Sequence, residues 1–292
     1  MVKITKAVIA CAGWGTRFLP AAKTYAKHLV PILNKPQIEY VLEELIGAGI
    51  TEVCIVHRHS EKTLKNHFKA NPELNHYLKT NHKASVLDSL TTINQKLKIK
   101  FIPQPRSLPY GNGTPILAAK SFIGSDPFVY LWGDDLTIEN KPGAFLSRLI
   151  NTFKKYKPDI ITSVIKQSPQ TIQHTAAVAY KKDPLYPYRI SDIIEKPALG
   201  TAPSLFSQGA RFIVSPNIIP VLENQAVSKG ELWFTNAEAT LAKTGIVLAV
   251  PYKKASWMAT GDPLNWLKAN ITLALRHPDY QKDLKTFLGS LN

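Results

Sequence analysis

The chain has 292 residues, and its 36 Lys plus Arg against 21 Asp plus Glu give a formal net charge of +15 at pH 7. Because 45 % of the residues are hydrophobic and 20 % are charged, the chain can bury a substantial core. This composition excludes intrinsic disorder, a collagen-like repeat and an acidic solvating tail. The positive charge is compatible with nucleic acid, a membrane surface or a phosphate-rich small substrate.

The basic residues are scattered along the chain, and no helix-turn-helix, RNP or zinc-finger pattern surrounds them. We therefore expect neither a nucleic-acid nor a membrane partner. The two cysteines, Cys11 and Cys54, lie in apolar runs, which argues against disulfides and a cysteine zinc site. The sequence starts without the apolar stretch of a signal peptide and has no run of about 18 apolar residues. These features predict a cytoplasmic protein.

Short β-rich runs alternate with helical patterns, which is typical of a mainly parallel sheet with helices on both faces. Several of the runs are continuously apolar, as buried parallel strands tend to be. The expected strands are Lys6–Cys11, Glu52–His57, Lys98–Ile102, Pro127–Trp132, Ile160–Ile165, Ala176–Tyr180, Ala210–Val214 and Ile246–Val250. The sequence thus predicts an α/β protein.

Three segments carry helical signals. Apolar residues at helical spacing predict a helix within Pro36–Gly49, and the polar stretch Asn71–Lys98 is expected to be an excursion with its own helix. Asp262 followed by Pro263 is typical of a helix start. The apolar stripe of that last helix, which we expect to pack on the core or on a partner subunit, comprises Leu264, Leu267, Ile271, Ala274 and Leu275.

The first strand runs directly into a loop that contains Gly13 and Gly15. Glycines at this point let backbone N–H groups approach a nucleotide, and Arg17 adds a cation suited to phosphate oxygens. The loop is neither a dinucleotide fingerprint nor a P-loop, because Phe18 takes the sixth position and no Gly-Lys-Ser/Thr follows. Two glycines alone more often form only a tight turn. Arg17 with Lys23 and Lys27 favours a polyphosphate site.

The ordered motifs of the chain resemble those of the sugar-1-phosphate nucleotidyltransferases, and in particular the bacterial uridylyltransferases that act on glucose 1-phosphate. The similarity covers essentially the whole chain. The residues that carry it are Ala7-Val8-Ile9, Ala12 to Pro20, Lys27, Pro31-Ile32, Lys35-Pro36, Glu39-Tyr40, Gln104, Gly111 to Gly113, Gly133 to Asp135, Glu195 to Pro197, Gly230 to Leu232, Gly261-Asp262 and Lys268 to Asn270.

This resemblance implies a Rossmann-like nucleotidyltransferase fold, with a mixed, mainly parallel sheet flanked by helices. It also implies a Mg²⁺-dependent reaction in which UTP and glucose 1-phosphate give UDP-glucose and pyrophosphate. We expect a single domain over residues 1–292, in which residues 1–135 mainly bind the nucleotide. Residues 136–292 would mainly bind the sugar and form the C-terminal helix. The family commonly forms homo-oligomers, so we expect one here.

The resemblance also assigns roles to individual residues. Arg17 and Lys27 would be catalytic cations that hold the triphosphate, and Asp134 would ligate Mg²⁺ at the carboxyl end of a strand. The nucleotide would be bound by Ala12, Gly13, Gly15, Thr16, Gln104 and Gly111. The sugar phosphate would be bound by Ala176, Glu195, Lys196 and Glu231.

Simpler interpretations of the same residues exist. The Asp134-Asp135 pair can be an ordinary turn, and Glu195-Lys196 can be a surface ion pair before a proline. The histidines His57, His59 and His82 have no metal-ligand spacing and are predicted to lie at the surface. The nucleotide loop upstream favours the functional interpretation of the acidic and sugar-side residues.

Four positions depart from the family pattern. His28 replaces an acidic neighbour of the catalytic lysine, Ala176 replaces a glycine beside the sugar, and Asn236 replaces an aspartate. Ala259 stands where the family places a second carboxylate on Mg²⁺, and an alanine cannot ligate a metal. The chain can therefore be a weakened natural enzyme, a catalytically silent paralogue, or a protein with a deliberate substitution.

Two hypotheses for the function follow. The first is a uridylyltransferase that makes UDP-glucose, as the ordered motifs indicate. The second is a non-catalytic subunit that binds a UDP-sugar or pairs with an active paralogue, as Ala176, Asn236 and Ala259 together suggest. An RNA-binding protein is disfavoured, because the aromatic residues do not interleave with Lys or Arg as a stacking platform requires.

Overall fold

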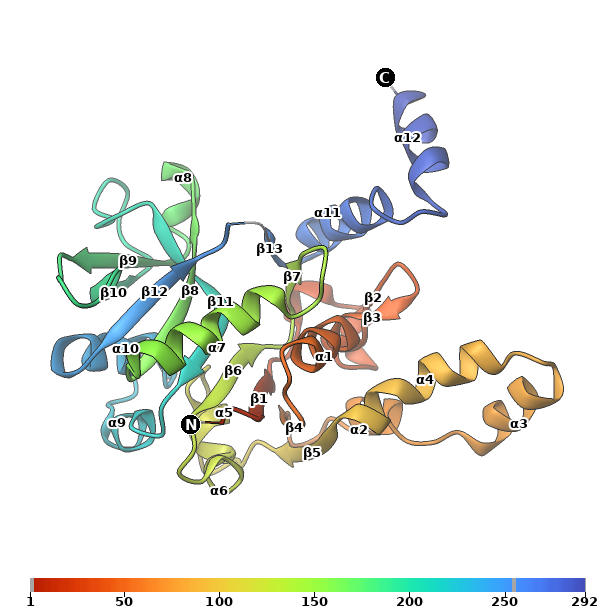
Figure 1. Cartoon of the computed structure of the whole chain (residues 1–292), viewed down its shortest axis with the longest axis horizontal. Coiled ribbons are helices and arrows are strands. Elements are labelled where there is room, and N and C mark those ends of the chain that lie inside the picture. The colour runs from red at the N-terminus through yellow and green to blue at the C-terminus, as the bar shows by residue number, and fades with distance from the viewer. Residues whose placement is uncertain (1–2, 254–255, 292) are drawn as a thin grey trace.

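A nine-stranded mixed sheet forms the centre of the molecule and carries helices on both faces, as the sequence predicts (Figure 1). The structure is a computed structural model that describes residues 3–253 and 256–291. The strand order is β5-β4-β1-β6-β11-β8-β12-β10-β9. The strands β5, β4, β1 and β6 run parallel, and β12 is parallel to β8. The strand β11 is antiparallel to both β6 and β8, so it joins the two parallel parts into one sheet.

The bounds of the elements are as follows. The strands are β1 Lys6–Cys11, β2 Pro31–Ile32, β3 Lys35–Pro36, β4 Glu52–His57, β5 Lys98–Pro103, β6 Phe128–Trp132, β7 Asp135–Ile138, β8 Ile160–Lys166, β9 Ala176–Lys181, β10 Arg189–Glu195, β11 Phe206–Val214, β12 Val247–Pro251 and β13 Ser256–Ala259. The helices are α1 Gln37–Gly47, α2 Thr63–His67, α3 Pro72–Thr80, α4 Ala84–Lys96, α5 Thr114–Ala118, α6 Lys120–Ile123, α7 Ala144–Tyr156, α8 Pro169–Ile172, α9 Ile218–Asn224, α10 Phe234–Thr244, α11 Pro263–Ala274 and α12 Gln281–Gly289.

Successive side chains of the strands point to opposite faces of the sheet, and they form two apolar layers of the core. On β1, the side chains of Ala7 and Ile9 join the layer that α1 and α7 cover. Val8, between them, joins the opposite layer with α5, α9 and α10. Because successive side chains of a strand point to opposite faces, a continuously apolar strand requires cover on both sides. This burial fixes the register of the strands whose carboxyl ends carry the polar loops.

All eight expected strands are present, with ends that differ by a few residues, but five strands were not predicted. The strands β2 and β3 have two residues each, and β7 and β13 have four. These are too short for an alternation pattern. The strand β10 escaped prediction because Arg189, Asp192 and Glu195 interrupt its apolar residues. It lies near the sheet edge, where it pairs with β9 and, through Arg189, with β12.

The stretch Asn71–Lys98 leaves the sheet as a helical excursion, as predicted, but it forms two helices, α3 and α4, where one was expected (Figure 1). One prediction about exposure was wrong. His57 is buried rather than exposed, because it ends β4 and its ring packs edge-on against Phe101. By contrast, His59 and His82 are exposed as predicted.

The C-terminal helix begins as predicted but buries a different face. The side chain of Asp262 accepts a hydrogen bond from the backbone N–H of Asn265 at 3.0 Å, so it caps α11. Of the predicted stripe, Leu264 and Leu267 are exposed, and Ala274 is buried. Within residues 3–253 and 256–291, no helix is both long enough and apolar enough to cross a bilayer.

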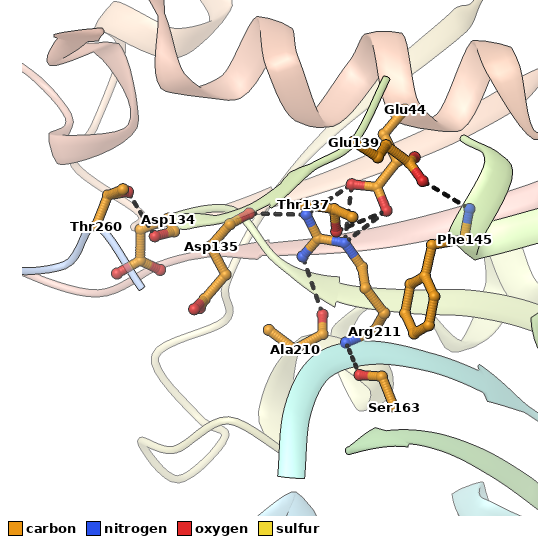
Figure 2. A network of polar contacts seen from close by, with 10 residues as sticks. All are labelled: Glu44, Asp134, Asp135, Thr137, Glu139, Phe145, Ser163, Ala210, Arg211 and Thr260. Carbon is orange, nitrogen blue, oxygen red and sulfur yellow. Dashed lines mark hydrogen bonds and ion pairs between the residues drawn. The ribbon is translucent and has the colours of Figure 1, made fainter. Parts of the chain in front are cut away.

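A buried ion pair connects α1 to β11 next to the segment that bears Asp134 and Asp135 (Figure 2). The guanidinium of Arg211 is fully buried and donates to both carboxylate oxygens of Glu44 at 2.7–3.0 Å. The same guanidinium donates to the backbone carbonyl of Asp135 at 2.7 Å, and the hydroxyl of Thr137 donates to Glu44 at 3.1 Å. Burial lowers the pKa of Arg211, but the charge of Glu44 and its hydrogen bonds raise it further, so the arginine stays charged.

Breaking this pair should destabilise the protein more than removing an exposed one. In Arg211→Met, the charge of Glu44 remains buried without its partner, so we expect the free energy of unfolding to fall by about 3–5 kcal/mol. Urea unfolding followed by circular dichroism measures the change. The matched control is Lys120→Met at the exposed Lys120–Glu223 pair, which should change stability little. Equal losses in the two variants would contradict the prediction.

Candidate active site

The loop after β1 wraps around the side chain of Lys27. Gly15 has a φ of 67°, a left-handed conformation that favours glycine. A Cβ added to Gly15 would lie 3.0 Å from Cβ of Lys27, and one added to Gly13 would lie 3.6 Å from its Nζ. The glycines therefore serve two purposes: they permit the turn, and they leave room for the lysine. Thr16 and Arg17 follow on a short 3₁₀ turn and are exposed.

Lys27 and Asp134 form an ion pair that joins two polar loops. Asp134 follows β6, and its Oδ2 lies 2.5 Å from Nζ of Lys27. Both side chains are more than four-fifths buried, with 17 % and 18 % of their surface exposed. Between β6 and Asp134, Gly133 is required, because a Cβ there would meet the Sγ of Cys11 at 2.6 Å. Parallel β1 and β6 end side by side, so their loops meet.

Burial and charge act in opposite directions on this pair. Burial lowers the pKa of Lys27, but the charge and hydrogen bond of Asp134 raise it above the usual value. Burial raises the pKa of Asp134, and the charge and hydrogen bond of Lys27 bring it below the usual value. Each partner therefore keeps the other ionised. His28 itself is neutral, because burial first and the charge of Lys27 second lower its pKa to about 3.

Two adjoining cavities gather most of the predicted site residues. One, of about 200 Å³, is lined by Ala12, Gly13, Gln104, Gly111, Asp134 and Glu231 among others. The second, of about 390 Å³, is lined by Gly13, Gly15, Thr16, Arg17, Lys27 and Asp134 among others. They share Gly13, Tyr110 and Asp134. Four of the residues predicted to bind the nucleotide, Ala12, Gly13, Gln104 and Gly111, thus line the first cavity, and Arg17 and Lys27 line the second. Lys23, which the sequence placed with these two cations, lines neither cavity and is exposed.

The loop that bears Gly111 is attached to the segment that bears Glu231. Gly111 has a φ of 134°, and a Cβ there would lie 2.3 Å from the backbone oxygen of Leu232. The N–H of Leu232 donates to the carbonyl of Tyr110 at 2.7 Å, and the N–H of Gly113 donates to the carbonyl of Leu232 at 2.9 Å. Only glycine allows so close a backbone approach. Glu231 is thereby brought to the first cavity from a distant part of the sequence.

The remaining sugar-side residues lie together at the ends of β9 and β10, outside the linings of the two cavities. Glu195 ends β10 and pairs with Ala176, the first residue of β9. Lys196 follows, and its Nζ lies 5.8 Å from the centre of the Trp233 ring. Burial raises the pKa of Glu195, Lys196 and a hydrogen bond from Thr235 lower it, and the charge of Glu231 raises it. The charges of Lys196 and Glu231 therefore both affect Glu195, as expected for residues that contact one ligand.

Asp134 is the carboxylate best placed to hold a metal ion. Its Oδ2 lies so close to Gly261 that a Cβ added there would approach to 2.6 Å, so the glycine leaves room for the carboxylate. In the part of the chain that the structure describes, no group of three or more His, Cys, Asp or Glu residues could hold a metal by themselves. Ala259 of β13 pairs with Asp135 and adds no carboxylate. The residues fit a metal held by one carboxylate together with substrate phosphates.

The backbone on both sides of Asp134 is held in place (Figure 2). The N–H and hydroxyl of Thr260 donate to the carbonyl of Asp134 at 2.9 and 2.7 Å. Arg211 holds the next carbonyl, that of Asp135. Burial and the neighbouring Asp134 raise the pKa of the Asp135 side chain to about 8. Asp134 lines both cavities and Asp135 lines neither, so Asp134 is the acid that faces the cavities.

Several residues that line the cavities were not predicted as site residues. Tyr110 lines both, Trp132 and Asn112 line the first, and Trp14 lines the second. Each is adjacent in sequence to a recognised glycine or aspartate, and that adjacency is the signal that could have found them. The ring of Trp14 lies 4.2 Å from the guanidinium of Arg58, which brings the end of β4 near the glycine loop.

The chain belongs to the nucleotidyl transferase family, whose sequence profile matches residues 6–275. Enzymes of this kind generally use a divalent metal ion. The predicted α/β fold of the family, a mixed sheet flanked by helices, is confirmed by this match and by the solved structures described next. The expectation of a mainly parallel sheet was wrong: among the described strands of the central sheet, four pairings are parallel and five are antiparallel.

Within the family, the chain is similar to uridylyltransferases. It is 35 % identical to UTP–glucose-1-phosphate uridylyltransferase of Streptococcus pneumoniae serotype 4, over 99 % of this chain and 96 % of that protein. A UTP-bound UDP-glucose pyrophosphorylase of Acinetobacter baumannii superimposes with a TM-score of 0.88, at 31 % identity, over 99 % of this chain and all of that one. A UDP-glucose pyrophosphorylase complexed with UDP-glucose gives a TM-score of 0.83 at 26 % identity, covering 94 % and 100 % of the two chains.

Removing the lysine should change the ionisation of the aspartate. In Lys27→Met, burial raises the pKa of Asp134 with much of the opposing charge removed, so we expect that pKa to lie above its ordinary value. Titration of the Asp134 carboxyl carbon by NMR measures it. Lys23→Met, which removes an exposed charge nearby, is the control and should leave the titration unchanged. An Asp134 that still ionises below its ordinary range in Lys27→Met would show that the pair does not govern its charge.

Proposed function

We propose that this protein is a uridylyltransferase that forms UDP-glucose and pyrophosphate from UTP and glucose 1-phosphate. The observation that carries the proposal is the Lys27–Asp134 pair, which lies where the glycine loop and the two cavities meet. The full-length similarity to enzymes named for this reaction supports it. The similar structures with UTP and with UDP-glucose support the same substrates.

The reaction requires charge neutralisation, because both substrates are polyanions. An oxygen of the sugar phosphate would attack the α-phosphorus of UTP, the bond to the β-phosphate would break, and pyrophosphate would leave. Arg17, exposed beside the larger cavity, would bind the outer phosphates. Lys27 stays protonated because Asp134 raises its pKa, so its ammonium is available to oxygens that gain charge in the transition state.

We assign the recognition of the two substrates to different parts of a single domain. Residues 1–135 would mainly bind the nucleotide, with Gln104 and the backbone of Ala12, Gly13 and Gly111 reading the uracil edge. Residues 136–292 would mainly bind the sugar phosphate. There Glu195 would accept hydrogen bonds from sugar hydroxyls, and Lys196 would contact the phosphate, next to Ala176 and near Glu231.

We propose Mg²⁺ as the metal ion and Asp134 as its protein ligand. A single carboxylate with phosphate oxygens and water is a usual way for proteins to hold Mg²⁺. When bound, the ion would supply positive charge and orient phosphate oxygens. The protein's own contribution is to keep Asp134 ionised, through Lys27, and to hold its backbone, through Thr260.

A second candidate function is a weakened or silent paralogue that binds a UDP-sugar as a regulatory subunit. The observation that favours it is the environment of Asp134, which has Lys27 at 2.5 Å and no second carboxylate from Ala259. Such a protein would bind nucleotide sugars and would turn them over slowly or not at all. Turnover distinguishes the two candidates.

The first test is pyrophosphate release from UTP, glucose 1-phosphate and Mg²⁺, with dTTP and other sugar 1-phosphates compared in parallel. We expect turnover with the named substrates, and we expect Lys27→Met to lower kcat by roughly 10²–10³-fold, because a charge aimed at the transition state is lost. Lys23→Met should retain the wild-type rate. Nucleotide-sugar binding without turnover would favour the regulatory subunit, and neither binding nor turnover would exclude both.

A second test restores a carboxylate beside the metal position. Ala259 pairs with Asp135 and precedes Thr260, whose N–H contacts the carbonyl of Asp134, so a carboxylate at residue 259 would lie near Asp134. We expect Ala259→Asp to bind Mg²⁺ more tightly, because each added charged ligand strengthens the site. Calorimetric titration of Mg²⁺ into the nucleotide complex measures this affinity. Ala259→Asn, which adds volume without charge, is the control, and an equal gain in both variants would argue against a metal at this place.

We further propose that the protein works in the cytoplasm and as a homo-oligomer. The helix α12 has no buried residue, and its Phe287 is 57 % exposed. Light scattering of the purified chain measures the assembly.

A further inference from the structure

A cavity of about 560 Å³ lies between α7 and β12, apart from the two cavities of the active site. It shares no lining residue with either of them. One face of α7 forms one wall, and the other walls are Ala249 to Pro251 on β12 and Pro187 with Tyr188 before β10. Its volume is within the usual range for sites that hold small molecules. The proposed reaction makes no use of this cavity.

The lining of the cavity carries positive charge. Arg148 and Lys155 come from α7, and Lys253 follows β12. Because residues three and four apart lie on one face of a helix, Ser147 and Asn151 lie beside the two α7 cations and add a hydroxyl and an amide. None of the described lining residues is acidic, and within residues 3–253 and 256–291 none of the three cations forms an ion pair. Such a set of cations attracts an anion.

Arg148 is the most constrained of the three cations. Its Nη2 donates to the carbonyl of Pro251 at 2.5 Å, and its guanidinium carbon lies 4.9 Å from the centre of the Phe145 ring. Among the described residues its Nη1 has no hydrogen-bond partner and, unlike its Nε, is not buried. Burial lowers the pKa of Arg148, and the charge of Glu139 offsets only part of that change. A bound anion would stabilise a cation that is partly removed from water in this way.

The cavity also has an aromatic wall. Tyr188 is 56 % exposed, so its ring is accessible to a ligand. Its carbonyl accepts a hydrogen bond from the N–H of Ala249 at 3.0 Å, which ties its backbone to β12. On α7, the Nζ of Lys155 lies 4.7 Å from the centre of the Tyr156 ring, which favours this position of the ammonium. An exposed ring beside cations fits a ligand that has both a flat apolar part and negative charge.

We infer that this cavity binds a small phosphate ester with a flat organic group, the phosphate on Arg148 and Lys155 and the flat group on Tyr188. Three cations and two neutral polar side chains line the cavity, and a phosphate dianion has the charge and the acceptor oxygens to meet several of them at once. A carboxylate offers one charge and two oxygens. The inference does not depend on the proposed function, because the two sites share no residue.

Calorimetric titration of the full chain with phenyl phosphate, at constant ionic strength, tests the inference. We expect Arg148→Met to weaken binding by roughly 10-fold, because a hydrogen bond between two charged groups is lost. Lys155→Met should weaken it by roughly 3-fold, since this lysine is exposed. Lys154→Met is the matched control: Lys154 is the neighbouring exposed lysine of α7 but does not line the cavity, so the variant should retain the wild-type affinity.

Two further probes identify the chemistry of the ligand. Inorganic phosphate lacks the ring and benzoate carries a single charge, so both should bind more weakly than phenyl phosphate. Tyr188→Leu should weaken the binding of phenyl phosphate and leave that of inorganic phosphate unchanged. Equal affinities for phenyl phosphate and inorganic phosphate would leave an adventitious anion site only. Benzoate that binds as tightly as phenyl phosphate would overturn the choice of a phosphate ester.

The remaining outcomes are equally decisive. The inference fails if phenyl phosphate does not bind at concentrations up to about 10 mM, or if Lys154→Met and Lys155→Met lose affinity equally. Displacement of phenyl phosphate by UDP-glucose would place the probe in the active site and would also overturn the inference. Circular dichroism establishes which variants are folded. If Arg148→Met does not fold without its bond to Pro251, the comparison of the two lysine variants and Tyr188→Leu still decide.

Discussion

The buried pair of Arg211 and Glu44 is the constraint on which the active site depends. It joins α1 to β11, and from the same guanidinium it holds the carbonyl of Asp135. A charge without water must find all its partners in the protein, which permits few alternative arrangements of these three segments. The position of Asp134 is therefore set on one side by Thr260 and on the other by Arg211, through the carbonyl of Asp135 (Figure 2). The ion pair with Lys27 then forms between loops that are already placed.

The sheet could be predicted to the extent that its strands are apolar on both faces. Runs such as Glu52–His57 have no other stable place than the interior. The strand β10 was missed because its polar residues interrupt its apolar pattern, and β7 and β13 because four residues have no measurable period. The two helices of the stretch 72–96 depend on the turn at His82, whose φ of 55° is not encoded in any apolar pattern. Long-range pairing, rather than local preference, creates these elements.

The candidate site likewise contains residues that short sequence motifs predict and residues that only the fold brings together. Gly13, Gly15, Lys27 and Asp134 lie within short motifs, and the ends of parallel strands bring such motifs together. By contrast, Arg58 lies in no recognised motif, and its contact with Trp14 depends on the pairing of β1 with β4. The raised pKa of Asp135 is likewise mainly a property of burial, and without the family resemblance the residue pattern does not distinguish Asp135 from Asp134.

The arrangement of the sheet has a consequence for how the protein could diversify. The proposed nucleotide residues follow β1, β5 and β6 in one half of the sheet, whereas Glu195 ends β10 near the opposite edge and Lys196 follows it. The pair Lys27–Asp134 lies at the meeting point. Under the proposed assignment, mutations of Glu195 or Lys196 change residues that line neither of the cavities where the nucleotide residues and the charged pair lie. Selection could then exchange one sugar for another without altering the lining of those cavities.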